Sequence, residues 1–221
     1  MLWKPMSLAR QYGITLFACA VFFAPDAVAQ ITLRPVDQAA SQPDFFTFRA
    51  HLQAAIARRD AAAVLAVVHK DIKNSFGGDD GREGFKQKWQ PESADSSLWK
   101  ELGAVLALGG SFDRDGQFVA PYVFSRWPDK VDSFENVAII GANVRVREAP
   151  RNDSATVGSL SFVVVPVLQE KEPHEGWTAI RQPNGKAGYV LSQYARSPID
   201  YRAAFKRIDN RWQLTLFLAG D

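Results

Sequence analysis

The sequence predicts an α+β fold in which a helical N-terminal half is followed by a β half. Three observations indicate this. Between residues 45 and 108, apolar residues recur every three or four positions, the spacing of a helix that buries one face. After Gly110 the chain divides into short segments separated by turn residues. The last segment alternates apolar and polar side chains from Trp212 to Leu218, as a strand with one buried face does.

The first 29 residues have the pattern of a secretory signal peptide. A start that carries Lys4 and Arg10 precedes an apolar run over residues 14–24, and the small residues of AVA at 27–29 allow cleavage before Gln30. The run is shorter than the about 20 apolar residues of a transmembrane helix. We therefore expect a periplasmic or secreted protein with no transmembrane segment after cleavage. An uncleaved membrane anchor is the alternative.

The single cysteine, Cys19, lies inside the apolar run, so cleavage leaves a chain without thiols or disulfides. A lipoprotein cleavage at LFAC is rejected, because the mature chain would then begin with the strongly apolar residues 20–24.

The formal net charge is only +2 at pH 7. Nucleic-acid binding depends on neutralising phosphates, so no nucleic-acid partner is expected. Residues 30–221 suit one domain or two small ones.

Residues 45–135 are expected to form a helical α+β domain, preceded by a mobile leader over residues 30–44. The first helix would start at Asp44 and the second at Asp60, because an aspartate at these positions accepts hydrogen bonds from the free N–H groups of a helix start. Two further helices are expected around Phe85 to Trp89 and from Leu98 to Leu108.

Residues 136–197 carry four motifs in a fixed order: VRVREAP at 144–150, SATVGSL at 154–160, EGWTAI at 175–180 and GKAGYVLSQYA at 185–195. In this order the segment resembles a bacterial SH3-like (SH3b) domain, a module of many exported and cell-wall proteins. The resemblance implies a small SH3-like β-barrel. It also places the arginine, the proline and the aromatic residues of the family at Arg147, Pro150, Trp177, Tyr189 and Tyr194.

The VRVREAP stretch contains two arginines that the resemblance distinguishes. Arg147 matches the family arginine, whereas Arg145 stands where the family usually has asparagine. Strand alternation puts both arginines on the side opposite Val144 and Val146, which are expected in the core. We expect Arg147 to make a structural hydrogen bond or a pair with a carboxylate, and Arg145 to be solvated.

The C-terminal hairpin, residues 198–221, is expected to turn near Asp209 and Asn210. Together with the N-terminal helices, its last strand weakly resembles the cone-shaped α+β fold of nuclear-transport-factor-two-like proteins. The resemblance implies that the SH3-like barrel is an insertion, and that the hairpin completes the sheet of the 45–135 domain.

Domains of the SH3-like kind present aromatic side chains along a shallow groove in which peptides lie. We therefore expect an exported, non-catalytic binding protein. Its binding residues would be Trp177, Tyr189, Tyr194 and Arg147, and its partner a cell-envelope peptide, a peptidoglycan fragment or an envelope protein. The structural alternative is that Trp177 and Tyr189 fill the interior of the barrel, because large aromatic side chains serve both roles.

The sequence contains no pattern that favours catalysis or metal binding. His51, His69 and His174 are far apart and form no HxH or HExxH pair, so neither a metal nor a cofactor is expected. The acidic stretch GGDDGRE at 77–83 fits a solvated turn better than a pair of catalytic carboxylates. The DRDG stretch at 113–116 lacks the remaining ligands of a calcium loop, and fits a hairpin turn.

A pocket in the 45–135 domain is the alternative function. Cone-shaped folds of the kind named above often enclose an apolar cavity that serves a small ligand or catalysis. Here its lining is expected from Trp89, Trp99, Phe112 and Tyr122, with Asp79 or Asp80 at the mouth. A third interpretation is a purely structural envelope protein in which the SH3-like domain packs on its neighbour.

Overall fold

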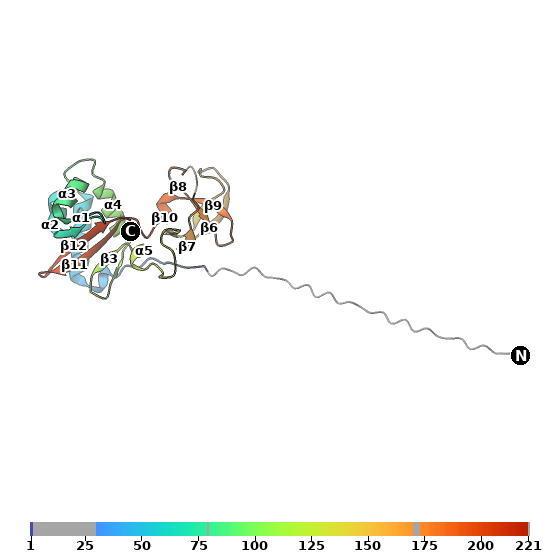
Figure 1. The fold of residues 1–221 in the computed structure, drawn as a ribbon, viewed down its shortest axis with the longest axis horizontal. Coiled ribbons are helices and arrows are strands. Elements are labelled where there is room, and N and C mark those ends of the chain that lie inside the picture. Colours follow the sequence, from blue (N-terminus) through green and yellow to red (C-terminus); the bar gives the residue numbers. More distant parts are fainter. Residues whose placement is uncertain (2–29, 79, 170–172, 221) are drawn as a thin grey trace.

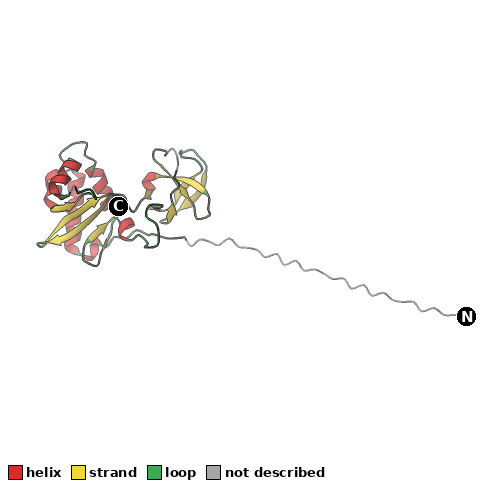
Figure 2. Cartoon of the chain, viewed as in Figure 1, coloured by secondary structure: helices red, strands yellow, loops and turns green. Residues whose placement is uncertain are grey.

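The computed structural model describes residues 1, 30–78, 80–169 and 173–220 (Figure 1). Apart from Met1, the predicted signal peptide lies outside the described residues, and so does Asp79. The described chain contains both helices and sheets, which confirms the α+β class. The long helices gather with one sheet in a helical part, and most of the remaining strands form a smaller β part (Figure 2). No helix in the described ranges is long and apolar enough to cross a membrane.

The helical part comprises residues 39–125 and 202–218. Asp60 caps its second helix as predicted, because the carboxylate accepts a 3.0 Å hydrogen bond from the N–H of Ala63. The first helix begins before Asp44, and the Asp44 carboxylate instead accepts a 3.1 Å hydrogen bond from the indole N–H of Trp212. The helices are η1 (Ala39–Ser41), α1 (Pro43–Ala57), α2 (Ala61–Val67), α3 (Gly81–Trp89), α4 (Leu98–Ala107) and α5 (Tyr122–Ser125).

The sheet of the helical part has the strand order β1-β12-β11-β3-β2. β1 lies parallel to β12, and the other neighbours are antiparallel. The hairpin at the end of the chain, β11 with β12, therefore supplies the middle of this sheet, and the β part is inserted between β3 and β11. The strands are β1 (Val68–Lys73), β2 (Ser111–Phe112), β3 (Phe118–Ala120), β11 (Arg202–Ile208) and β12 (Arg211–Leu218).

The terminal hairpin turns at Asp209 and Asn210, which both have positive φ, 48° and 60°. Two adjacent residues of this kind make the tight turn whose twist matches an antiparallel pair of strands. A register shift between β11 and β12 then interrupts the alternation that the sequence suggests. As a result Phe217, and not its neighbour Leu216, is fully buried.

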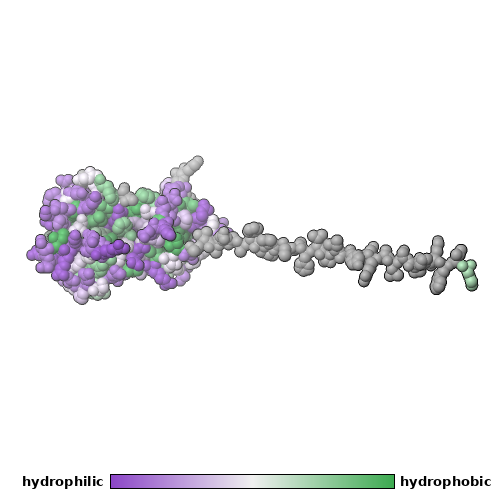
Figure 3. All heavy atoms as spheres, turned by 60° about the horizontal axis from the view of Figure 1, so that its bottom comes forward, coloured by the Kyte–Doolittle hydropathy of each residue, from purple (hydrophilic) through white to green (hydrophobic). Residues whose placement is uncertain are grey.

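Phe45 of α1 lies at the centre of the core of the helical part. Its ring centroid is 4.4 Å from that of Phe118, 4.8 Å from that of Trp212 and 5.8 Å from that of Phe205. One side chain thus joins α1 to three strands, at separations where aromatic rings attract each other. Hydrophilic residues cover most of the surface of this part in the view of Figure 3.

The β part forms two open sheets, of order β10-β4-β7 and β6-β5-β9-β8, so the predicted closed barrel is not shown. β7 is three residues long and ends at Pro166. The two sheets meet at an isolated bridge between Val167 and Ile180. The elements are β4 (Asn136–Ile139), β5 (Val144–Arg147), β6 (Thr156–Leu160), β7 (Val164–Pro166), β8 (Trp177–Arg181), β9 (Ala187–Leu191), η2 (Ser192–Tyr194) and β10 (Ala195–Arg196).

Residues 31–38, here called the strap, differ from the mobile leader that the sequence suggests. Val164 donates a 2.9 Å hydrogen bond to the carbonyl of Ile31, which binds the strap to the β part. Gln38 donates a 2.9 Å hydrogen bond to the carbonyl of Gly110, which binds it to the helical part. Leu33 is buried between these two points. The strap is held because its partners come from segments far away in the sequence.

Candidate functional site

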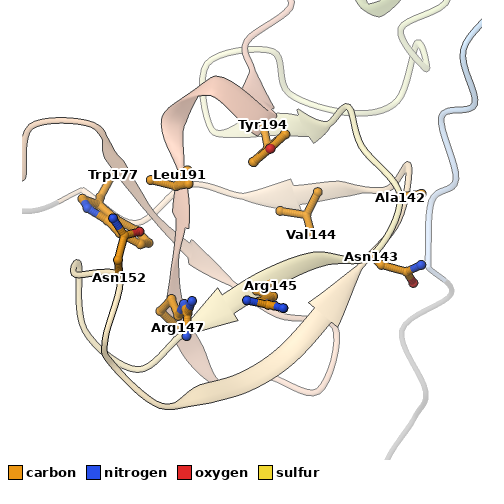
Figure 4. Close-up of a pocket in the computed structure, with 9 residues that line it drawn as sticks. All are labelled: Ala142, Asn143, Val144, Arg145, Arg147, Asn152, Trp177, Leu191 and Tyr194. Atoms are coloured by element: carbon orange, nitrogen blue, oxygen red, sulfur yellow. The ribbon is translucent and has the colours of Figure 1, made fainter.

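A hollow of about 360 Å³ opens in the β part (Figure 4). This volume lies within the range of pockets that hold small ligands, about 300–1,000 Å³. Two loops, the strand β5, the ends of β8 and β9, and the short helix η2 contribute to its wall. Its lining consists of Ala142, Asn143, Val144, Arg145, Arg147, Asn152, Trp177, Leu191 and Tyr194.

Three of the four residues predicted to bind a ligand line this hollow: Arg147, Trp177 and Tyr194. They come from β5, β8 and η2, so the fold brings together positions that are far apart in the sequence. The fourth residue, Tyr189, is not part of the lining. It pairs with Arg147 across β5 and β9, and its ring meets that of His174 edge-on, with the centroids 5.8 Å apart.

Arg147 supports the loop beside the hollow as well as lining it. Its Nη1 donates a 2.8 Å hydrogen bond to the carbonyl of Ser154 and a 3.2 Å hydrogen bond to Oγ1 of Thr156. These contacts confirm the structural hydrogen bond expected for this arginine. They also hold the guanidinium in one place, so that a ligand does not have to order it.

Arg145 also lines the hollow, although the sequence indicated only a solvated side chain. Its side chain is exposed, as expected, but it lies beside Arg147 in the wall of the hollow (Figure 4). The signal was available in the alternation of β5, which places both arginines on one face and buries Val144 and Val146 on the other. What the sequence did not show is that Leu191 and Tyr194 face this strand.

The aromatic wall lies opposite the arginines. In Figure 4, Trp177 stands beside Leu191 and Asn152, and Tyr194 borders the hollow on the side away from Arg145. Trp177 is half-buried, whereas Tyr194 is 39% exposed. Gly141 lies against Val144 in this wall, where a Cβ would come within 2.9 Å of Cγ2 of Val144.

The lining of the hollow is positively charged. It contains two arginines and no aspartate or glutamate. In the part of the chain that the structure describes, neither Arg145 nor Arg147 forms an ion pair. An anionic ligand would therefore meet two guanidinium groups whose charge no neighbouring carboxylate neutralises.

A second hollow, of about 660 Å³, lies between α4 and the chain around β10. Its charged residues largely pair with one another. Arg196 donates a 2.7 Å hydrogen bond to the carbonyl of Tyr201 and lies 3.6 Å from the carboxylate of Asp200. Burial, and the neighbouring charge of Glu101, raise the pKa of the Tyr201 phenol. The pairs Arg196–Asp200 and Lys100–Glu101 offset each other's charge, so this hollow offers less net charge to a ligand than the hollow with the two arginines.

Three of the four aromatic residues expected to line a pocket in the helical part, Trp89, Trp99 and Phe112, pack in the hydrophobic core of that part. Trp89 packs against Phe217, with ring centroids 4.9 Å apart, and Phe112 packs against Phe118 at 5.2 Å. Tyr122 belongs to a separate apolar cluster with Leu33. Burial raises the pKa of Tyr122 to about 12.

The acidic and imidazole side chains have structural surroundings too. The Asp80 carboxylate accepts a 2.9 Å hydrogen bond from the backbone N–H of Asn74, which ties the end of β1 to the start of α3 and fits the turn interpretation. Nδ1 of His69 accepts a 3.1 Å hydrogen bond from the N–H of Asp71. Among the described residues, no group of three or more His, Cys, Asp or Glu side chains gathers around a common point.

Comparisons with known proteins identify no relative. No family model, curated protein or solved structure matches the chain. The function is therefore inferred from the residues of the hollow and from the motifs of residues 136–197.

Proposed function

We propose that this protein is an exported, non-catalytic binding protein, and that its β part is an SH3-like domain that docks a cell-envelope peptide in the hollow lined by Arg147, Trp177 and Tyr194. The convergence of these three side chains carries the proposal. Each was selected by its place in a sequence motif, and the outermost two, Arg147 and Tyr194, are 47 residues apart in the sequence. A shared hollow is what a common binding role requires.

The chemistry of the lining supports binding of a peptide. The faces of Trp177 and Tyr194 offer apolar contact area at a low cost in side-chain entropy. Asn143 and Asn152 offer amide donors and acceptors for the backbone of an extended chain. Among the described residues that line the hollow there is no Ser, Cys, His, Asp or Glu. The wall therefore consists of groups that hold a ligand.

The signal-peptide pattern of residues 1–29 supports a ligand that is located in the cell envelope. Export puts the β part in contact with the envelope, where the peptides of peptidoglycan are abundant. We take peptidoglycan as the source of the peptide, and an envelope protein as the other source that the experiment distinguishes.

We also propose that the helical part has the nuclear-transport-factor-two-like arrangement, in which the β part is an insertion. The place of the terminal hairpin in the middle of the five-stranded sheet supports this. The helical part then serves to hold the SH3-like domain. The packing of Trp89 and Phe112 in the core, and of Tyr122 in a separate apolar cluster, gives no specific support to a ligand pocket there.

The experiment is a sedimentation assay with purified, insoluble peptidoglycan. It compares the chain from Gln30 onward with Trp177→Ala and Tyr194→Ala, and with Phe134→Ala as a control. Phe134 is 60% exposed and lies outside the hollow, so its removal deletes an exposed aromatic ring without touching the wall. We expect the wild-type protein and the control to bind, and each hollow variant to bind about tenfold more weakly, since anchoring aromatic residues contribute 1–2 kcal/mol or more.

Tyr194→Ala keeps the test valid if Trp177→Ala fails to fold, because Tyr194 is more exposed. Equal sedimentation of all four proteins would show that the hollow is not the binding site. If the wild-type protein does not sediment, peptidoglycan is not the ligand. An envelope protein then remains as the source of the peptide.

A further inference from the structure

We propose that the hollow selects ligands that carry carboxylate groups, and that Arg145 is the residue that sets this selectivity. The inference rests on the proposed docking of a peptide in the same hollow, and it adds the chemical class of the ligand.

The argument begins with charge. Arg145 and Arg147 are separated by one residue on β5, so their side chains leave the same face of the strand about 7 Å apart. The lining contributes no carboxylate to pair with them. Two neighbouring cations in a wall without acidic groups attract an anion, and a guanidinium and a carboxylate match each other in a two-point hydrogen bond.

The two arginines have different parts in this arrangement. Arg147 is already bonded to Ser154 and Thr156, so part of its hydrogen-bonding capacity is used within the protein. Arg145 is exposed, and in the described chain no hydrogen bond or ion pair to its side chain is observed. Its donors can therefore all turn to a ligand. For this reason the loss of Arg145, rather than of Arg147, should change selectivity without changing the fold.

The aromatic wall favours a carboxylate on a peptide over a phosphate polymer. A polyanion is bound best by an extended track of cations, with one contact for each phosphate. Here the cations of the lining are confined to Arg145 and Arg147, and the opposite wall presents Trp177, Leu191 and Tyr194. A short peptide with a carboxylate near its end can use both walls, because its apolar atoms contact the rings while the charge reaches the guanidinium groups.

Calorimetric titration with two forms of one probe tests the proposal. The probe is a set of soluble peptidoglycan fragments released by a muramidase, used untreated and after conversion of their carboxylates to amides with carbodiimide and ammonia. The proteins are the wild-type chain from Gln30, Arg145→Gln and Lys186→Gln. Lys186 is exposed and lies outside the hollow, so its substitution removes the same charge as Arg145→Gln.

We expect amidation to weaken binding by the wild-type protein about tenfold or more, which corresponds to the loss of one charge-assisted contact. Arg145→Gln should bind the untreated fragments about tenfold more weakly than the wild-type protein does, and should respond little to amidation. Lys186→Gln should behave like the wild-type protein.

The outcomes separate the two proposals. If the wild-type protein binds both forms equally well, the proposed selectivity for carboxylates is wrong, and the proposed docking of a peptide in the hollow stands. If it binds neither form, peptidoglycan is not the source of the peptide, and both the docking of peptidoglycan and the selectivity for its carboxylates are rejected. Displacement of the fragments by inorganic phosphate, but not by succinate at the same ionic strength, would overturn the assignment to carboxylates. The comparison of the two probe forms with the wild-type protein needs no variant, so the test of selectivity for carboxylates does not depend on how well a variant folds.

Discussion

Arg49 and Asp37 form a two-point ion pair that ties the strap to α1. Nη1 and Nη2 of Arg49 donate to Oδ1 and Oδ2 of Asp37 at 2.7 and 2.8 Å. The Arg49 side chain is 9% exposed and that of Asp37 is 45% exposed. The same strap is hydrogen-bonded to the β part at Ile31 and Leu33, so this pair lies on a connection between the two parts.

Replacement of Asp37 by asparagine should lower the free energy of unfolding by about 1–2 kcal/mol, because it leaves the buried guanidinium of Arg49 without its counter-charge. The loss is smaller than for a fully buried pair, since water reaches about half of Asp37. Urea denaturation measures it. The matched control is Asp153→Asn, which removes an exposed pair with Arg151 and should change stability by less than about 0.5 kcal/mol. Equal effects of the two substitutions would contradict the anchoring role.

The contribution of Asp37 should depend on pH. Burial by itself would raise the pKa of Asp37, but hydrogen bonds from Arg49 and the Ala39 N–H, with the charge of Arg49, together hold it below the ordinary 3.8. The folded state then binds the proton less readily than the unfolded state. The stabilisation by Asp37 is present in full above the pKa that Asp37 has in the unfolded state. It is lost as the pH falls through the pKa that Asp37 has in the folded state.

The difference in unfolding free energy between wild type and Asp37→Asn should therefore be constant from about pH 7 to about pH 5 and shrink at lower pH. Urea titrations at a series of pH values measure this difference. A difference that does not change down to about pH 2 would show that the charge of Asp37 is not the cause.

Arg147→Ala should destabilise the protein by about 1–2 kcal/mol, whereas Arg145→Ala should change stability by less than about 0.5 kcal/mol. Arg147 holds the loop through Ser154 and Thr156, and Arg145 is exposed to solvent. Thermal denaturation of the two variants, followed by near-ultraviolet circular dichroism, measures the difference. Equal shifts of the melting temperature would contradict the separate roles of the two arginines.

Phe205→Ala should destabilise the helical part by about 3–5 kcal/mol, because it opens a cavity where β11 meets α1. Phe205 is fully buried, with ring centroids 5.8 Å from Phe45 and 5.9 Å from Phe48. Denaturation monitored by the helical circular dichroism signal measures this. Phe134→Ala is the control and should have little effect. If Phe205→Ala loosens only the β part, as judged by hydrogen exchange, the hairpin does not stabilise the helices.

Local patterns in the sequence predict those features that depend on neighbouring residues. The buried positions of α3, Phe85 and Trp89, follow from helical spacing, and the cap at Asp60 follows from its place before an apolar run. The structural hydrogen bond of Arg147 was expected from the resemblance to the SH3-like family, and its partner Ser154 is only seven residues away. In each case the pattern and the partner lie within one stretch of chain.

Features that depend on distant partners could not be predicted in this way. Asp44 has the local environment of a helix cap, but its partner Trp212 is 168 residues away. The strap has no periodicity, and its order comes from hydrogen bonds to Phe162 and Gly110. Arg145 looked like an ordinary solvated residue, because the wall that faces it comes from η2 and the end of β9.

The most direct test of the central claim is a titration of the ¹⁵N-labelled chain from Gln30 with soluble peptidoglycan fragments, followed by amide and side-chain chemical shifts. We predict that the largest changes occur at the wall of the hollow, in the backbone of Arg145, Arg147 and Asn152 and in the indole N–H of Trp177, and that they saturate together. Saturating changes that gather instead around Glu101 and Tyr201, in the hollow beside α4, would contradict the account.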